Sequence, residues 1–87
     1  MFPFTEANKD GVLIREFKES TDSEELIWHR DREDRKVRVL SSNGWRLQLD
    51  NQLPVYLEEG KIYFIEKFLF HRVIKGKGDL VVEITKK

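Results

Sequence analysis

The sequence predicts an all-β fold made of short antiparallel strands, and two observations support this class. Apolar and polar residues alternate with a period of two along most of the chain, as they do in strands that bury one face. The alternating segments are separated, about every eight to twelve residues, by breaks that contain Gly, Asn, Asp or Ser, which is typical of a β-sandwich or a small barrel. A chain of 87 residues has room for one core, so residues 1–87 are expected to form a single domain.

The individual elements follow from this pattern in chain order. Residues 1–10 are expected to be loosely held, and the capping-box sequence at 21–24 predicts a helical turn within residues 19–26. Strands are predicted at residues 12–17, 36–39, 45–50, 53–57, 62–65, 71–74 and 80–84. The run 62–65 is apolar throughout, so we expect it to be buried on both faces. Most of the larger aromatic side chains are expected in the core, namely Trp28, Trp45, Tyr63, Phe64, Phe68 and Phe70.

Composition excludes several classes of protein. Sixteen basic and sixteen acidic side chains give a net charge of zero, and no window approaches the ~18 apolar residues of a membrane-spanning helix. Interleaved charges of both signs also argue against a nucleic-acid partner, since such binding favours a surface of one sign. The chain has no cysteine, which excludes disulfides and thiolate metal sites. Without a recognisable secretory signal, a cytoplasmic location is expected.

Two histidines and one aspartate are the candidate metal ligands. His29 and Asp31 are two positions apart, so both side chains leave the same face of an extended strand. His71 is the other histidine of the chain and would supply a ligand from a second strand. A set of two histidines and one carboxylate suits iron, manganese, nickel or zinc.

Two stretches of the chain resemble the motifs of the cupin family. Gly60 and His71 fall in register with the glycine and the histidine of the second cupin motif, and the triplet His29-Arg30-Asp31 resembles the His-x-His of the first. The segment 39–44 resembles the family's turn between two core strands. The departures are Asp31 in place of histidine, Ser42 and Phe68 in place of glycine, Glu66 in place of proline and Lys75 in place of asparagine. The resemblance covers residues 26–84.

The resemblance implies a small double-stranded β-helix, the antiparallel barrel of the cupins, with a metal at its mouth held by His29, Asp31 and His71. The family's glutamate ligand falls on Arg35 or Lys36, and a cation there would pair with Asp31 and compete with a metal. Two interpretations stay open. One is a metal-dependent oxygenase or isomerase acting on a small polar molecule, and the other is a metal-free module that binds a ligand or a protein.

Four residues are candidates for contact with a small-molecule ligand: Arg35, Gln48, Trp45 and Phe70. Arg35 would bring a positive charge to the mouth, and Trp45 a face for stacking. Gln48 is a polar residue that would face the pocket if its side of the strand points inward, and Phe70 would close the mouth beside His71. Residues 12–18 are expected to present an exposed edge, which a homodimer would cover.

Overall fold

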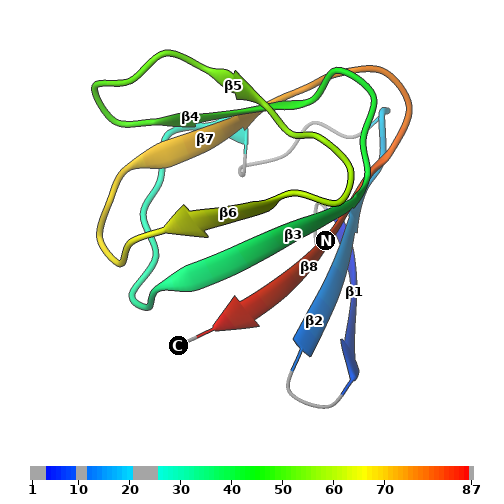
Figure 1. Cartoon of the computed structure of the whole chain (residues 1–87), viewed down its shortest axis with the longest axis horizontal. Helices are drawn as coiled ribbons and strands as arrows, with labels where there is room; N and C mark the ends of the chain where they lie inside the picture. The colour runs from blue at the N-terminus through cyan, green and yellow to red at the C-terminus, as the bar shows by residue number, and fades with distance from the viewer. Residues whose placement is uncertain (1–3, 10–11, 21–25, 87) are drawn as a thin grey trace.

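A computed structural model describes residues 4–9, 12–20 and 26–86 of the chain. Over these residues the chain forms two facing sheets, seen as the upper and lower layers in Figure 1. The larger sheet has the order β1-β2-β8-β3-β6, the smaller sheet has the order β5-β4-β7, and neighbouring strands pair antiparallel. The strands are β1 (Phe4–Lys9), β2 (Val12–Phe17), β3 (Arg35–Ser41), β4 (Arg46–Leu49), β5 (Val55–Tyr56), β6 (Ile62–Ile65), β7 (His71–Ile74) and β8 (Leu80–Lys86).

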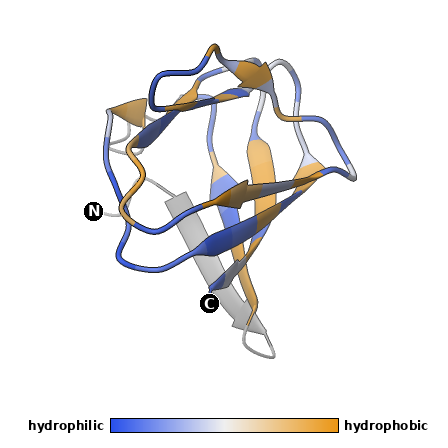
Figure 2. Ribbon diagram, turned by 60° about the vertical axis from the view of Figure 1, so that its left-hand side comes forward, coloured by the Kyte–Doolittle hydropathy of each residue, from blue (hydrophilic) through white to orange (hydrophobic). Residues whose placement is uncertain are grey.

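Period-two alternation decides which side chains fill the space between the sheets. In β8, Leu80, Val82 and Ile84 are buried, whereas the residues between them are partly exposed. In β3, Val37 and Val39 point inward in the same way. Figure 2 shows how apolar and polar stretches are distributed over the strands of the two sheets. Within the described part of the chain, the buried apolar core consists of Phe17, Val37, Val39, Trp45, Leu47, Leu57, Ile65, Leu80, Val82 and Ile84.

A close contact between two turns closes one end of the molecule. A Cβ at Gly76 would lie 2.4 Å from the backbone atoms Asn43 O and Trp45 N, so only glycine fits there. Lys77 N donates to Asn43 O at 2.8 Å, and the Trp45 indole donates to Gly78 O at 3.2 Å. The turn that precedes β4 is therefore held against the connection between β7 and β8, which crosses from the smaller sheet to the larger one.

The all-β class is confirmed, and residues 4–9 add a strand at the N-terminal end of the described chain. These residues form β1, which pairs with β2 along its whole length, from Phe4 opposite Phe17 to Lys9 opposite Val12. Pairing with β2 places this segment at the edge of the larger sheet, and the expectation that residues 1–10 are loosely held stays a prediction. Residues 21–25, which carry the predicted helical turn, lie outside the described residues.

The apolar run in β6 is buried on one face, not on both. Ile65 is 6% exposed, but Ile62 is 54% and Phe64 50% exposed. The reason is the two-layer architecture, because the larger sheet has the core on one face and its other face lies outside the sandwich. Other aromatic side chains expected in the core are also on the surface, namely Trp28, Phe68 and Phe70.

The strand at residues 12–17, which was expected to form an exposed edge, is an interior strand of the larger sheet. In the larger sheet, β2 lies between β1 and β8, so its backbone is paired on both sides. The exposed edge expected at residues 12–18 is therefore covered by β1. Dimerisation stays a prediction that no longer rests on this edge.

In the part of the chain that the structure describes, there is no helix with the length and hydrophobicity needed to cross a bilayer.

Candidate metal centre

The two histidines lie opposite each other in a short backbone pairing. His29 N donates to His71 O at 3.0 Å and His71 N donates to His29 O at 2.8 Å, so the His29 segment adds an antiparallel bridge to β7. Residues paired in this way project their side chains to the same face of a sheet. The two imidazole rings are accordingly 4.3 Å apart between centroids. The backbone bridge between these two segments therefore brings the imidazoles together, although the histidines are 42 positions apart in the sequence.

Backbone carbonyls fix the protonation of both imidazoles. His29 Nδ1 lies 2.8 Å from Ile27 O, and His71 Nδ1 lies 2.8 Å from Leu69 O. A carbonyl oxygen only accepts hydrogen bonds, so Nδ1 carries the proton in both rings. In the neutral imidazole, Nε2 is then the nitrogen with the lone pair, which is the atom that binds metals.

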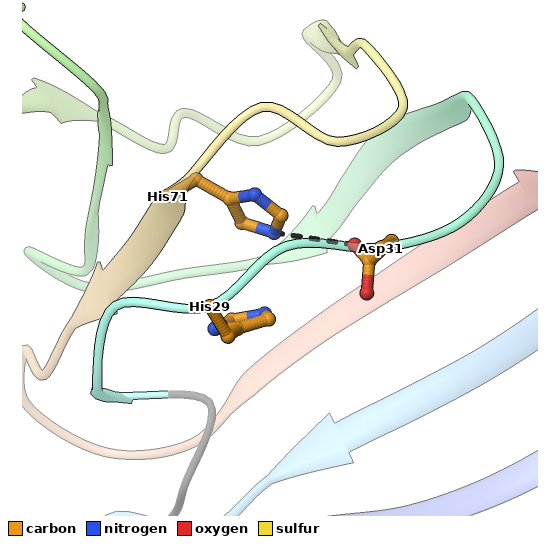
Figure 3. A group of neighbouring side chains, drawn as sticks. All are labelled: His29, Asp31 and His71. Atoms are coloured by element: carbon orange, nitrogen blue, oxygen red, sulfur yellow. Dashed lines mark ion pairs between the residues drawn. The ribbon is translucent and has the colours of Figure 1, made fainter.

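Asp31 completes the cluster, as Figure 3 shows. His29, Asp31 and His71 each offer one potential ligand atom, and these three atoms lie within 4.8 Å of one another. Asp31 Oδ2 is 3.3 Å from His71 Nε2, and within the described structure this buried oxygen has no hydrogen-bond partner. With Nδ1 protonated, Nε2 is the His71 atom that faces the carboxylate, and a metal ion placed between them would contact both Nε2 and Oδ2.

Neighbouring charges determine the ionisation of Asp31. Burial works to raise the pKa of this carboxyl, but the contact with His71 and the charge of Arg35 outweigh burial. His29 adds a smaller effect in the same direction, and the pKa of Asp31 lies below its ordinary value. Asp31 is therefore a carboxylate at neutral pH, as a metal ligand must be.

Arg35, at the start of β3, occupies the position next to Asp31. Its Nη2 lies 3.5 Å from Asp31 Oδ1 and donates to Glu33 Oε1 at 3.1 Å. Lys86 Nζ, at the end of β8, lies 3.7 Å from the same Glu33 oxygen. Of the two positions that the motif offered for the glutamate ligand, Arg35 thus faces the site, whereas Lys36 is exposed. The guanidinium competes with a metal for Oδ1 and leaves Oδ2 to face His71.

A loop with an unusual backbone supports the site from outside. Phe68 has φ of 62°, a left-handed conformation that a bulky residue rarely adopts, and it stands where the cupin motif has glycine. Phe68 N donates to Asp31 O at 2.7 Å, and Lys67 N donates to Asp34 Oδ1 at 2.8 Å. These hydrogen bonds hold the loop against Asp31 and Asp34 and offset the cost of the left-handed conformation.

A cavity of about 50 Å³ lies beside the cluster, between the two sheets. Its lining residues include Arg35 and His71, and also Arg15, a buried residue of β2 that is 6% exposed. Sequence reasoning overlooked Arg15. The signal was available, because Arg15 alternates in step with Phe17 and so shares its inward face.

The structure brings His29, Asp31, His71 and Arg35 together, but the other three candidate ligand contacts lie elsewhere. Trp45 is buried in the core, and Phe70 is 43% exposed with the Arg30 guanidinium 5.3 Å from its ring centre. Gln48 accepts a hydrogen bond from Arg72 Nε at 2.9 Å. The described lining of the cavity includes none of these three residues. Their contact with a ligand stays a prediction.

Solved structures of low sequence identity share this fold. A cupin domain from Bordetella pertussis Tohama I is 22% identical, with a TM-score of 0.67 over 100% of this chain and 97% of that chain. A cupin-2 domain protein from Shewanella frigidimarina NCIMB 400 is 18% identical, with a TM-score of 0.66 over 93% of this chain and 76% of that chain. HppE, solved with Fe(II) and its substrate, is 14% identical, with a TM-score of 0.68 over 97% of this chain and 52% of that chain.

No family model and no curated protein sequence matches the chain. The structural similarities therefore establish the fold. The chain has the cupin fold that the motif resemblance predicts.

Proposed function

We propose that this cupin-fold chain binds one divalent first-row metal ion through His29, Asp31 and His71, next to a cavity that takes a small polar molecule. The observation that carries the proposal is the convergence of three potential ligand atoms within 4.8 Å of one another. Two histidines and one carboxylate leave coordination positions open for a substrate, and iron, manganese, nickel and zinc all accept such ligands. Fe(II) in the structural neighbour HppE supports iron as the first ion to test.

The surrounding residues prepare the ligands for this role. The carbonyls of Ile27 and Leu69 orient the imidazoles and hold the proton on Nδ1, which is the usual outer-shell arrangement of metal-binding histidines. The lowered pKa of Asp31 keeps its carboxylate ionised. When bound, the ion would supply Lewis-acid or oxygen-activating chemistry, of the kind used by oxygenases and isomerases. The protein's part is to present the substrate from the cavity and to limit the access of water.

One observation favours a second function, which is a metal-free pocket that binds a ligand without catalysis. Arg35 stands where the cupin motif has its glutamate ligand, and its guanidinium is 3.5 Å from Asp31. In the metal-free protein, the Arg35 guanidinium would balance the charge of the Asp31 carboxylate. The same residues then form an ion-paired wall of a binding pocket.

Metal titration separates these two functions. Protein expressed without an affinity tag, stripped with a chelator and returned to pH 7.5, is titrated with Fe²⁺ under argon and with Mn²⁺, Ni²⁺ and Zn²⁺. We expect about one equivalent to bind, because the three residues form a single site. A protein that takes up none of the four ions would contradict the metal function and leave the metal-free pocket.

Two variants test whether binding takes place at this site. His71→Ala is expected to abolish uptake, but His71 is buried and its loss can also disturb the fold. His29→Ala, at a less buried position, is the second variant, and circular dichroism reports folding for both. Full uptake by folded His29→Ala protein would place the ion elsewhere.

A further inference from the structure

The cavity beside the metal cluster combines an apolar wall with cationic side chains. The apolar wall consists of Phe17, Val37, Leu47, Leu57, Ile65, Val73, Leu80, Val82 and Ile84. The remaining described lining residues are Arg15, Arg35 and His71. Two arginines therefore belong to the described lining, and no acidic residue does. A ligand that fits such walls carries a negative charge at one end and is otherwise apolar.

Arg35 is the residue best placed to hold that charge. Its side chain is 13% exposed, and its Nη2 is engaged by Glu33 and Asp31. Its Nε is buried, and in the described structure this nitrogen has no hydrogen-bond partner. A guanidinium offers five N–H donors in a fork that matches a carboxylate. The contacts of Nη2 with Glu33 and Asp31 therefore leave Nε as a donor for a ligand. A buried donor without a partner also costs free energy that an acceptor on a ligand would recover.

Charge balance favours an anion further if the metal site is filled. The acidic partners Asp31 and Glu33 are matched in the metal-free protein by Arg35 and Lys86. A divalent cation at Asp31 would leave this region with an excess of positive charge. In a partly buried site, that excess attracts an anionic group more strongly than it would in water.

We propose that the cavity binds a short-chain monocarboxylate, with its carboxylate on the Arg35 guanidinium and its alkyl end against the apolar wall. This inference rests on the proposed metal site for its chemical use, since the ligand would lie beside His71, Asp31 and the bound ion. A cavity of about 50 Å³ is a small site, so a short chain is the appropriate ligand. Propionate is the short-chain monocarboxylate to test. Inorganic phosphate fits less well, because most of the wall lacks donors for its four oxygens.

Calorimetric titration with sodium propionate, and with propionamide as the neutral isostere, tests the proposal. Both ligands are added to the metal-free and to the metal-loaded protein, and the metal content of every sample is measured. We expect propionate to bind at least about tenfold more tightly than propionamide, because it adds charge-assisted hydrogen bonds. Equal binding of the two ligands, or binding of neither, would overturn the proposal.

A matched pair of arginine variants locates the binding. Arg35→Gln is expected to weaken propionate binding about tenfold or more, while Arg38→Gln, which changes a half-exposed arginine paired with Glu83, leaves it unchanged. Equal propionate affinity in wild type and Arg35→Gln would overturn the assignment. If Arg35→Gln does not fold, Arg35→Lys keeps the charge but loses the fork, and we expect it to bind propionate more weakly than wild type does.

The metal measurements in the same samples keep the two proposals separate. Selective propionate binding that depends on Arg35, in a protein that takes up no metal, supports this inference and contradicts the metal function. One equivalent of metal with no preference for propionate supports the metal function and overturns this inference.

Discussion

Two clusters of charged residues in this molecule use similar groups in opposite surroundings. The site cluster consists of Asp31, Glu33, Arg35 and His71, and the loop cluster consists of Glu16, Lys18 and Asp79. In the site cluster, the side chains of Asp31 and Arg35 are 12% and 13% exposed, and His71 is buried. In the loop cluster, Lys18 lies 3.0 Å from Glu16 and 3.3 Å from Asp79, with side chains 35–49% exposed.

The two clusters lower the pKa of their aspartates for different reasons. The pKa of Asp79 is lowered first by a hydrogen bond from Glu19 N, with a further contribution from Lys18, and water solvates the group in any case. The pKa of Asp31 is lowered against the effect of burial, which acts to raise it. Exposed ion pairs contribute little to stability, whereas buried ones keep a large desolvation cost. The site cluster therefore keeps a desolvation cost that the exposed loop cluster does not have.

The largest expected difference between the clusters is in metal affinity. Asp31→Asn should weaken metal binding by more than about a hundredfold, since even outer-shell changes cost about 10–100-fold. Asp79→Asn is the matched control and should leave affinity unchanged, because Asp79 lies outside the site. Competition with a chromophoric chelator measures both variants. Equal affinities of the two variants would mean that burial of the carboxylate does not mark the binding site.

The second comparison concerns stability. Arg35→Gln removes a cationic partner of the partly buried Asp31 and should lower the free energy of unfolding by about 1–3 kcal/mol, less than for a fully buried pair. Lys18→Gln removes an exposed lysine and should leave the urea midpoint unchanged within error. Urea denaturation of metal-free protein measures both. A larger loss for Lys18→Gln would reverse the ranking of the clusters.

The pH dependence of stability sharpens the comparison at a single carboxylate. Because the folded pKa of Asp31 lies below its ordinary value of 3.8, its ionised form stabilises the fold above that pH. The contribution is lost as the pH falls through the folded pKa. Thermal unfolding of metal-free protein between about pH 6 and 2 should therefore show a shallower acid decline in Asp31→Asn than in wild type. An unchanged decline would mean that Asp31 is not stabilised in its ionised form.

Salt should produce the smallest of these effects. At about 1 M ionic strength the screening length falls to about 3 Å, so the exposed pairs of Lys18 are weakened first. The stability difference between wild type and Lys18→Gln, if any is seen at low salt, should vanish at high salt. The difference between wild type and Arg35→Gln should persist. Urea curves at both ionic strengths make the comparison, and loss of the Arg35 effect in salt would argue that its pair is solvated.

Sequence reasoning predicted more of the fold than of the site's surroundings. Alternation identified the interior of β2 and β8, and the spacing from Gly60 to His71 pointed to the cupin fold. It did not predict β1, which pairs along β2. An apolar run such as Ile62–Ile65 also does not show whether one face or both are covered, and so the exposed outer face of β6 was missed.

For the site, the sequence contained the residue types but not their contacts. The bridge between His29 and His71 and the choice of Arg35 over Lys36 depend on how distant segments pack. Gln48 lies on the face opposite the buried Leu47, so the hydrophobic alternation of β4 already favoured an outward position for it. The same alternation in β2 predicts that Arg15 points inward with Phe17.

The most direct test of the metal site is nitrogen NMR of the two histidine side chains in ¹⁵N-labelled protein. Long-range ¹H–¹⁵N spectra are recorded before and after one equivalent of Zn²⁺ at pH 7.5. We expect both imidazoles to keep the proton on Nδ1, and the Nε2 resonances of His29 and His71 to shift together to metal-bound values. Nε2 resonances that stay unchanged in both histidines would contradict a metal centre formed by His29, Asp31 and His71.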